Sequence, residues 1–263
     1  GKADTDEAMA KFREAIRVAP GYADPWINIG LALSRRNDKA GAEEAFLRAL
    51  DIAPEDANAL GCLGGLALKH FEFEEAERCY LRLVKLQPEN TALFLSLGQA
   101  QRSQGKFDAA IKSWLTALRL DSQFWQAHNE LGLAYTDTAR TKKALPHFQA
   151  GLRLKPDSVD ILINMGRLHL LEASPAEAET WFLKAEELAP DHPGLVNALG
   201  AICNQRGRPE EAIARFRKVT ELAPDFTTGW VNLSHLLLEQ CRFAEGWPLY
   251  ERRYQEQAYR KIH

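Results

Sequence analysis

The sequence repeats itself every 34 residues, and this period constrains the fold more than any other feature. A glycine recurs at that spacing without an insertion, at Gly30, Gly64, Gly98, Gly132, Gly166 and Gly200. Ser234 occupies the next position of the column. Twelve positions after each of these lies a small residue: Ala42, Ala76, Ala110, Ala144, Ala178, Ala212 and Gly246. An aromatic side chain follows four positions later, as in Phe46 and Tyr250, and a proline closes most copies, as in Pro54. Such regularity predicts a stack of equivalent units.

Each copy predicts two amphipathic helices. Apolar residues at spacings of three and four, such as Trp26, Ile29 and Leu33, indicate the first helix, and the alanine and aromatic columns belong to the second. We expect the glycine to face the alanine, which would bring the two backbones close together, and the aromatic side chain to fill the space between helix pairs. The closing proline ends the second helix because it has no amide donor. Whether Pro146, inside a second helix, bends it is left open.

These columns resemble the tetratricopeptide repeat family, whose signature is Trp-x-x-Leu-Gly-x-x-Tyr followed by Ala-x-x-x-Phe and Pro. Residues 26–30 (WINIG) and 230–234 (WVNLS) come close to the first block, and residues 131–135 (LGLAY) contain its second half. The resemblance implies an all-α, right-handed superhelical solenoid of antiparallel helix pairs, with the first helices on the concave face. Residues 1–22 are then the second helix of a truncated repeat, 23–226 are six complete repeats, and 227–263 are a final repeat and its capping or junction helix. We therefore expect the natural N-terminus to lie farther upstream.

Composition argues against two classes of partner. The 33 basic and 36 acidic residues give a net charge of −3, which provides no field for nucleic acid. The longest apolar run, residues 59–68, is much shorter than the roughly 20 residues of a membrane-spanning helix, so membrane insertion is not expected. Four cysteines, Cys62, Cys79, Cys203 and Cys241, lie far apart without a Cys-x-x-Cys pair. This pattern favours reduced thiols and a cytoplasmic location.

No catalytic or metal-binding motif is found. The seven histidines form no His-Glu-x-x-His motif, and His169 is interpreted as a core or groove-edge imidazole. The glycine-rich segment 61–65 lacks the Lys-Ser/Thr pair that completes a phosphate-binding loop. The acidic pairs Glu74-Glu75 and Glu210-Glu211 lie near the starts of second helices, where they favour the helix dipole. We therefore expect this chain to have no enzymatic activity, cofactor or metal of its own.

The resemblance places partner contacts on the first helices. The position two before the glycine carries Asn28, Asn164 and Asn232, a partial version of the asparagine ladder in the large O-linked N-acetylglucosamine transferases, where amides bind an extended peptide backbone. Gly61 and Gly65 leave bare backbone on the same face. A merely solvated helix surface is the alternative. The expected partner-binding residues are Asn28, Asn58, Gln99, Arg102, Gln126, Asn129, Asn164, Arg167, Asn197, Asn204, Asn232 and His235.

One known recognition mode of the family is disfavoured. Chaperone-binding members resemble one another in a lysine three positions before the glycine, which clamps a C-terminal carboxylate. Here that column contains no lysine and reads Ile27, Gly61, Leu95, Asn129, Ile163, Asn197 and Val231.

Two hypotheses of function remain. The first is a scaffold that binds a protein or peptide partner in its concave groove. Residues 243–254 (FAEGWPLYERRY) resemble the final repeat of bacterial proteins in which such repeats run into a covalently linked glycosyltransferase domain, so the chain is expected to recruit substrates for a larger enzyme. The second is an assembly adaptor that acts through its convex face and ends, where Trp125, Trp181 and Trp247 either mark a surface or pack between repeats. Arg253 occupies the column of an alanine that packs against the next repeat, and an arginine there would be costly to bury. Ala258 replaces the closing proline, and we therefore predict that no ninth repeat follows.

Overall fold

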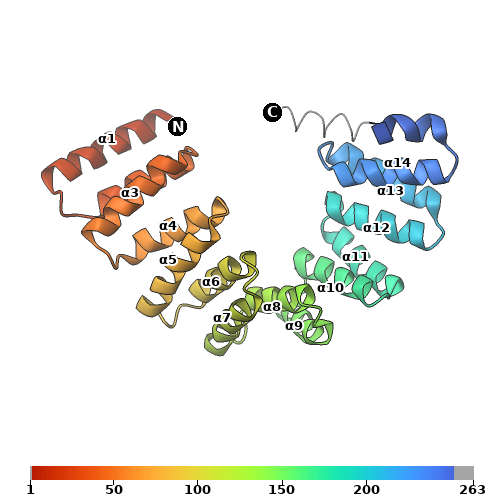
Figure 1. Cartoon of the computed structure of the whole chain (residues 1–263), viewed down its shortest axis with the longest axis horizontal. Helices are drawn as coiled ribbons and strands as arrows, with labels where there is room; N and C mark the ends of the chain where they lie inside the picture. The colour runs from red at the N-terminus through yellow and green to blue at the C-terminus, as the bar shows by residue number, and fades with distance from the viewer. Residues whose placement is uncertain (1, 252–263) are drawn as a thin grey trace. The chain divides into compact units, whose positions relative to one another are not determined.

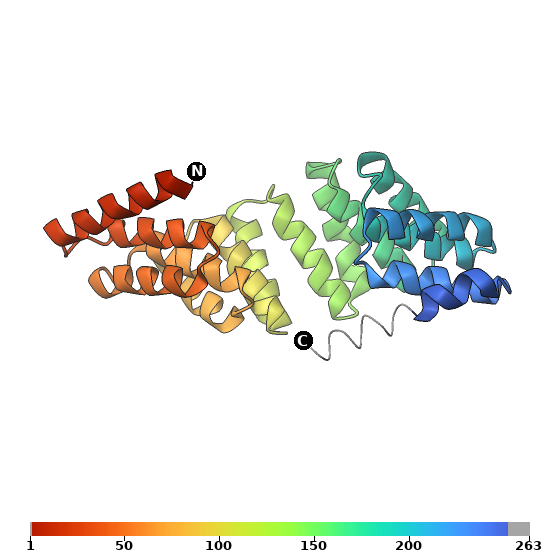
Figure 2. The same cartoon turned by 90° about the horizontal axis from the view of Figure 1, so that it is seen from above.

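The computed structural model describes residues 2–251, and every regular element within them is an α-helix. Residues divide into two compact units, 1–139 and 140–263, which we describe separately. Figure 1 shows the helices of each unit stacked in chain order, and Figure 2 shows the same stacking from above. The predicted fold class, an all-helical solenoid of consecutive antiparallel pairs, is confirmed. None of the helices in the described part of the chain is long and apolar enough to cross a membrane.

The first unit contains eight helices. They are α1 (Lys2–Val18), α2 (Asp24–Arg35), α3 (Lys39–Ile52), α4 (Ala57–Lys69), α5 (Phe73–Leu86), α6 (Thr91–Ser103), α7 (Phe107–Leu120) and α8 (Trp125–Asp137). Helix α2 pairs with α3, α4 with α5 and α6 with α7, and each pair packs against the next helix along the chain. In addition, α2 contacts α4, and α6 contacts α8. The first helices of successive repeats are therefore neighbours and form one face of the unit.

The second unit continues the pattern. Its helices are α9 (Thr141–Leu154), α10 (Val159–Leu171), α11 (Pro175–Leu188), α12 (Pro193–Gln205), α13 (Pro209–Leu222) and α14 (Thr227–Glu239), and residues 243–251 are also helical. Helix α9 continues through Pro146, so this proline does not end the helix. Helix α10 pairs with α11 and α12 with α13, and α14 packs against α13.

The glycine column faces the aromatic column, and our expectation that it faces the alanine was wrong. A Cβ atom added to Gly166 would lie 2.6 Å from the ring of Phe182, and one added to Gly200 would lie 2.7 Å from the ring of Phe216. Glycine is therefore needed because the ring from the second helix lies directly on the backbone of the first. Phe182 also belongs to a buried cluster with Leu195 of the next pair, so one side chain contributes to both the hairpin and the stack.

Turn residues complete each repeat. The second helices end two residues before the closing proline, as α3 does before Pro54 and α11 before Pro190. Between the first and second helices of each repeat one residue has a left-handed backbone: Asn37, Phe71, Gly105, Ala139, Ala173, Gly207 and Cys241. Two of the seven are glycine, the residue that adopts this conformation without strain. The others are held there by the helices on either side.

The C-terminal helix packs as a second helix where it is described. A Cβ atom on Gly246 would lie 2.8 Å from Leu238 on α14, and Leu249 packs on the buried cluster that contains Phe216. The Trp247 ring is half exposed and meets Tyr250 edge to face at 5.7 Å. Arg253 and Ala258, on which the prediction of a final repeat depends, lie outside the described residues.

Candidate functional site

A hollow of about 570 Å³ lies between α2 and α4, two neighbouring first helices. It brings together two of the predicted residues, Asn28 and Asn58, both of which are exposed. Gly61 lies beside them, and a Cβ atom added there would meet no atom within 4 Å. The hollow is lined by Asp24, Ile27, Asn28, Leu31, Ala57, Asn58, Gly61 and Cys62. It therefore combines apolar walls, two side-chain amides and an uncovered stretch of backbone.

The ionisable groups near this hollow are few. Asp56 is engaged as the cap of α4, where its carboxylate accepts a hydrogen bond from the Ala59 amide at 2.8 Å. Burial, with a smaller contribution from Asp56, raises the pKa of the Cys62 thiol, which is consequently neutral at ordinary pH. No basic side chain lines the hollow. Its recognition chemistry is thus that of neutral amides and carbonyls, with Asp24 as the one carboxylate in the lining.

Between α6 and α8 the predicted residues are occupied by acidic partners. The Gln99 amide donates to Glu130 at 3.4 Å, and the Arg102 guanidinium donates to Asp137 at 2.9 Å. Arg102 also lies 3.8 Å from the Glu130 carboxylate. Glu130 and Asp137 were not among the partner-binding residues predicted from the sequence. The spacing in the sequence could have indicated these pairs, because Gln99 and Glu130 are 31 residues apart and Arg102 and Asp137 are 35 apart, close to one repeat.

In the second unit two of the predicted amides pair with each other. The Asn232 amide donates to the side-chain oxygen of Asn197 at 2.9 Å, and both side chains are partly buried. Asn164 is only 8 % exposed, so little of its side chain is accessible to a partner. The exposed His235 ring lies 5.8 Å from that of Tyr250. Arg167 and Asn204 are exposed, while Gln126 and Asn129 of the first unit are half-buried on α8. The structure therefore joins Asn232 to Asn197 and leaves Arg167, Asn204 and His235 exposed.

Buried carboxylates hold successive repeats in place. Glu179 on α11 pairs with Arg206 and Arg208, which follow α12, and Glu77 on α5 accepts from Lys106, Gln104 and Gln101 of the next repeat. Burial alone would raise the pKa of Glu179, but the hydrogen bonds and charges of Arg208 and Arg206 outweigh it and lower the pKa below its usual value. The pKa of Glu77 is lowered in the same way, against the effect of burial, chiefly by Lys106 and the two glutamines. These contacts join the second helix of one repeat to the first helix of the next and to the turn that follows it.

Other chemistry is sparse in the described residues. No group of three or more His, Cys, Asp or Glu side chains among them is arranged to hold a metal ion. All four cysteines are free thiols, and burial, with Glu75, raises the pKa of Cys79 to about 12. His169 is partly buried and lies 3.7 Å from the Glu172 carboxylate at the end of its own helix.

Models of one repeat family match most of the chain. Residues 98–138 match a model described as TPR repeat, and residues 1–57, 129–193 and 194–226 match two described as tetratricopeptide repeat. All of these matches are to the repeat itself, so the expected link to a glycosyltransferase is not supported by them. None of the curated proteins matches the sequence.

Solved structures with the same fold are numerous, and three are informative. A tetratricopeptide repeat protein from Parabacteroides merdae is 17% identical, with a TM-score of 0.73 over 89% of this chain and 92% of that one. A chain of the APC/C hetero-tetramer Cut9-Hcn1 is 16% identical, with a TM-score of 0.70 over 90% of this chain, which spans only 46% of that chain. YrrB, described as a TPR protein with an unusual peptide-binding site, is 22% identical, with a TM-score of 0.52 over 72% of this chain and 97% of that one. At these identities the likeness shows the fold alone.

Proposed function

Because this chain is a tetratricopeptide repeat protein, a scaffold for protein–protein interaction, we propose that its first helices bind an extended polypeptide. The observation that carries the proposal is the hollow between α2 and α4, where Asn28, Asn58 and the open backbone at Gly61 lie together.

The chemistry of this hollow suits a peptide backbone. An asparagine side chain both donates and accepts hydrogen bonds, so it matches the N–H and C=O of a peptide unit whatever side chain that unit carries. At Gly61 a bound chain can approach the helix more closely than beside any other residue. Ile27 and Leu31 of α2 add apolar surface to the lining. These features favour a peptide-binding groove over a merely solvated surface.

Related folds are compatible with this role. YrrB is described as having a peptide-binding site, and Cut9 is part of a hetero-tetramer with Hcn1. We propose by analogy that this chain also binds a protein or peptide partner. Its free thiols favour a reducing compartment such as the cytoplasm.

The link to a glycosyltransferase stays a prediction. It depends on the resemblance of residues 243–254 to the final repeat of bacterial proteins that carry such a domain. In that case this non-catalytic chain would recruit substrates for the linked enzyme. The complete gene is the check, because a glycosyltransferase domain after the repeats would support the prediction and its absence would refute it.

Substitutions in the hollow test the proposed groove. A binder is first selected from a random peptide library, and its affinity is measured by fluorescence polarisation. We expect Asn28→Ala with Asn58→Ala, and separately Gly61→Leu, to weaken it about tenfold or more, since two lost hydrogen bonds are worth about 2 kcal/mol. Gly61→Leu fills open space and improves helix propensity, so the fold is retained. Gln123→Ala, an exposed amide in the turn after α7, is the matched control. Undiminished affinity in both groove variants would refute the proposal.

A further inference from the structure

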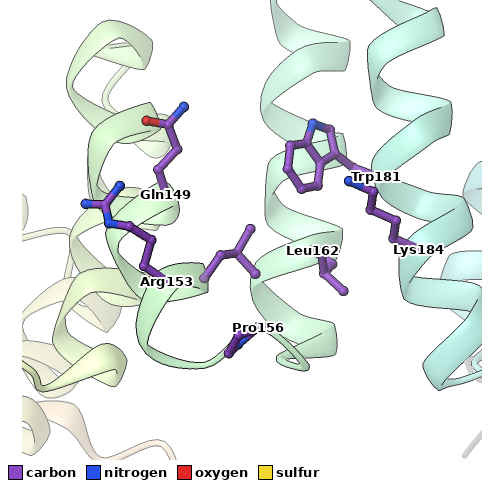
Figure 3. A pocket seen from close by; sticks show the side chains of 7 residues that line it. Gln149, Arg153, Pro156, Leu162, Trp181 and Lys184 are labelled. Carbon is purple, nitrogen blue, oxygen red and sulfur yellow. The ribbon is translucent and has the colours of Figure 1, made fainter.

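A second hollow lies between α9 and α11, the second helices of two successive repeats, and has a volume of about 370 Å³. Figure 3 shows Gln149 and Arg153 projecting from α9 on one side and Trp181 and Lys184 from α11 on the other. Pro156 lies near its lower end, and Leu152 and Leu162 complete the lining. This hollow uses different helices from the groove between α2 and α4, and nothing in the proposed function accounts for it.

The walls of this hollow are apolar. Leu152 and the half-buried Trp181 pack against the buried cluster that contains Leu162 and Phe182. The indole of Trp181 is thus held on one side by the core and is open on the other. A fixed aromatic side chain beside an apolar depression is the arrangement found at the centre of many protein interfaces.

The next junction along the chain shows why this one is open. Between α11 and α13 the positions one repeat later hold Glu186 and Arg215, whose side chains form an ion pair at 2.6 Å across the two helices. At the α9–α11 junction the same two positions hold Leu152 and Trp181, which cannot form such a bridge. An ion pair therefore spans the α11–α13 junction, whereas the α9–α11 junction is lined by an apolar pair.

Lys184 differs from two other basic residues of its column. One repeat later, Lys218 donates to the carbonyl oxygen of Pro190 at 2.8 Å, and Arg82 in the same column donates to the carbonyl of Pro54. The corresponding carbonyl here is that of Pro156, yet the Lys184 ammonium lies over the Trp181 ring, 4.4 Å from its centroid. The cation consequently stands at the edge of the hollow.

Positive charge gathers at this edge, where Arg153 and Lys184 both line the hollow. Among the ion pairs of the described residues none includes Arg153 or Lys184, whereas Arg208, Arg215 and Arg242 of the same unit all pair with glutamates. Helix α9 contains Lys142, Lys143 and Arg153 and no acidic residue. Glu179 and Glu186 of α11 are engaged by arginines of the following repeat, Glu187 of the same helix is exposed, and no carboxylate lines the hollow.

We propose that this hollow docks an acidic segment of a partner protein, in which one large apolar or aromatic side chain is flanked by Asp or Glu. The apolar side chain enters between Leu152 and Trp181. The flanking carboxylates pair with Arg153 and Lys184, where an acidic segment is favoured over a basic one by charge complementarity. The Gln149 amide is placed to bond to the backbone of the docked segment.

Short synthetic peptides test this site. An array carries a central Trp, Phe or Leu flanked by Asp and Glu, with two matched series in which the acids are replaced by Asn and Gln, or the central residue by Ala. Binding to the complete chain is measured by fluorescence polarisation. We expect the acidic apolar peptides to bind at least tenfold more tightly than either matched series. Equal binding of all three series, or no binding by the acidic apolar peptides, would overturn the proposal.

Two sets of variants locate the binding. Arg153→Glu with Lys184→Glu should weaken the acidic peptides at least tenfold, whereas Lys142→Glu, on the same helix but outside the hollow, should change their affinity less than twofold. Leu152→Glu with Trp181→Arg recreates the ion pair of the α11–α13 junction and should close the hollow and abolish binding. Circular dichroism verifies the fold of each variant. The charge-reversal variant changes only the exposed residues Arg153 and Lys184, so it tests the proposed site even if the Leu152→Glu, Trp181→Arg variant fails to fold.

The two proposals fail independently. Gly61→Leu should leave the affinity of the acidic peptides unchanged, because Gly61 lies on α4 in the other unit. Unchanged binding in the charge-reversal variant, or equal loss in Lys142→Glu, would show that the peptides bind elsewhere and would overturn the assignment to this hollow.

Discussion

The ring of Phe182 lies so close to the backbone of Gly166 that a Cβ atom on the glycine would be 2.6 Å from it. The same relationship joins Gly200 to Phe216, and in each case the glycine is on a first helix and the ring on the second helix of the same pair. This contact sets how closely the two helices of a repeat approach each other.

Gly166→Ala should therefore destabilise the protein even though alanine is the better helix former. Overpacking a core costs about 1–3 kcal/mol, against a gain in helix propensity of about 1 kcal/mol. We expect the free energy of unfolding in chemical denaturation to fall by up to about 2 kcal/mol. Gly61→Ala is the matched control, since it lies in a helix with open space around it and should be neutral or stabilising. Equal effects of the two substitutions would contradict the proposed packing.

The turn after α10 gives a prediction of opposite sign. Ala173 has a φ of 55°, in the left-handed region, where a Cβ atom is unfavourable. Ala173→Gly should raise the free energy of unfolding by about 0.5–1 kcal/mol, once the greater freedom of glycine in the unfolded chain is subtracted. Gly207→Ala at the equivalent turn, where φ is 71°, should lower it by a similar amount. Thermal denaturation of both variants checks the pair, and a loss of stability in Ala173→Gly would count against it.

Much of the fold follows from the sequence because a strict period fixes which residues are equivalent. The glycine, aromatic and proline columns predicted helix pairs, and the second helices do end just before the prolines. The period does not say which side chain crosses from one helix to the other, so the partner of the glycine was assigned to the alanine column when it is the ring. The left-handed turn residues could have been found, because Gly105 and Gly207 fall in their column.

The candidate site was predicted less completely. The sequence predicted bare backbone at Gly61 on the face of the first helices, and a Cβ atom added there would meet no atom within 4 Å. That Asn28 and Asn58 lie beside this glycine is known from the structure. The sequence did not indicate that Arg102 is engaged by Asp137, or that Asn164 is almost fully buried, because both depend on how side chains of successive first helices meet. The hollow at Trp181 could not be predicted by comparing equivalent residues one column at a time. It arises where Leu152 and Trp181, on different helices, line one junction with apolar side chains, whereas Glu186 and Arg215 form an ion pair at the next.

Glu179 predicts how stability depends on pH. Its pKa is lowered in the folded protein, against the effect of burial, by Arg208 and Arg206, so its contribution is full above the unfolded value of about 4.3 and is lost as pH falls through the folded pKa. Glu179→Gln should lower the free energy of unfolding by about 1–3 kcal/mol at pH 7. This difference from the unmodified protein should shrink as the pH falls below about 4.

Glu177→Gln is the control for this measurement, because Glu177 is exposed in the first turn of the same helix. It should change the free energy of unfolding by less than about 0.5 kcal/mol at pH 7. A difference between the Glu179 variant and the unmodified protein that stays constant from pH 7 to pH 3 would argue against the ion pairs as its cause.

Photo-crosslinking from within the groove tests the central claim, that the first helices bind an extended polypeptide. A p-benzoylphenylalanine residue is placed at position 58, and separately at positions 123 and 153, and each protein is irradiated with the library-selected peptide. The cross-linked residues are then identified by mass spectrometry. The account predicts cross-links from position 58, which lines the hollow between α2 and α4, and none from position 123. Cross-links from position 153 alone, or from no position, would contradict it.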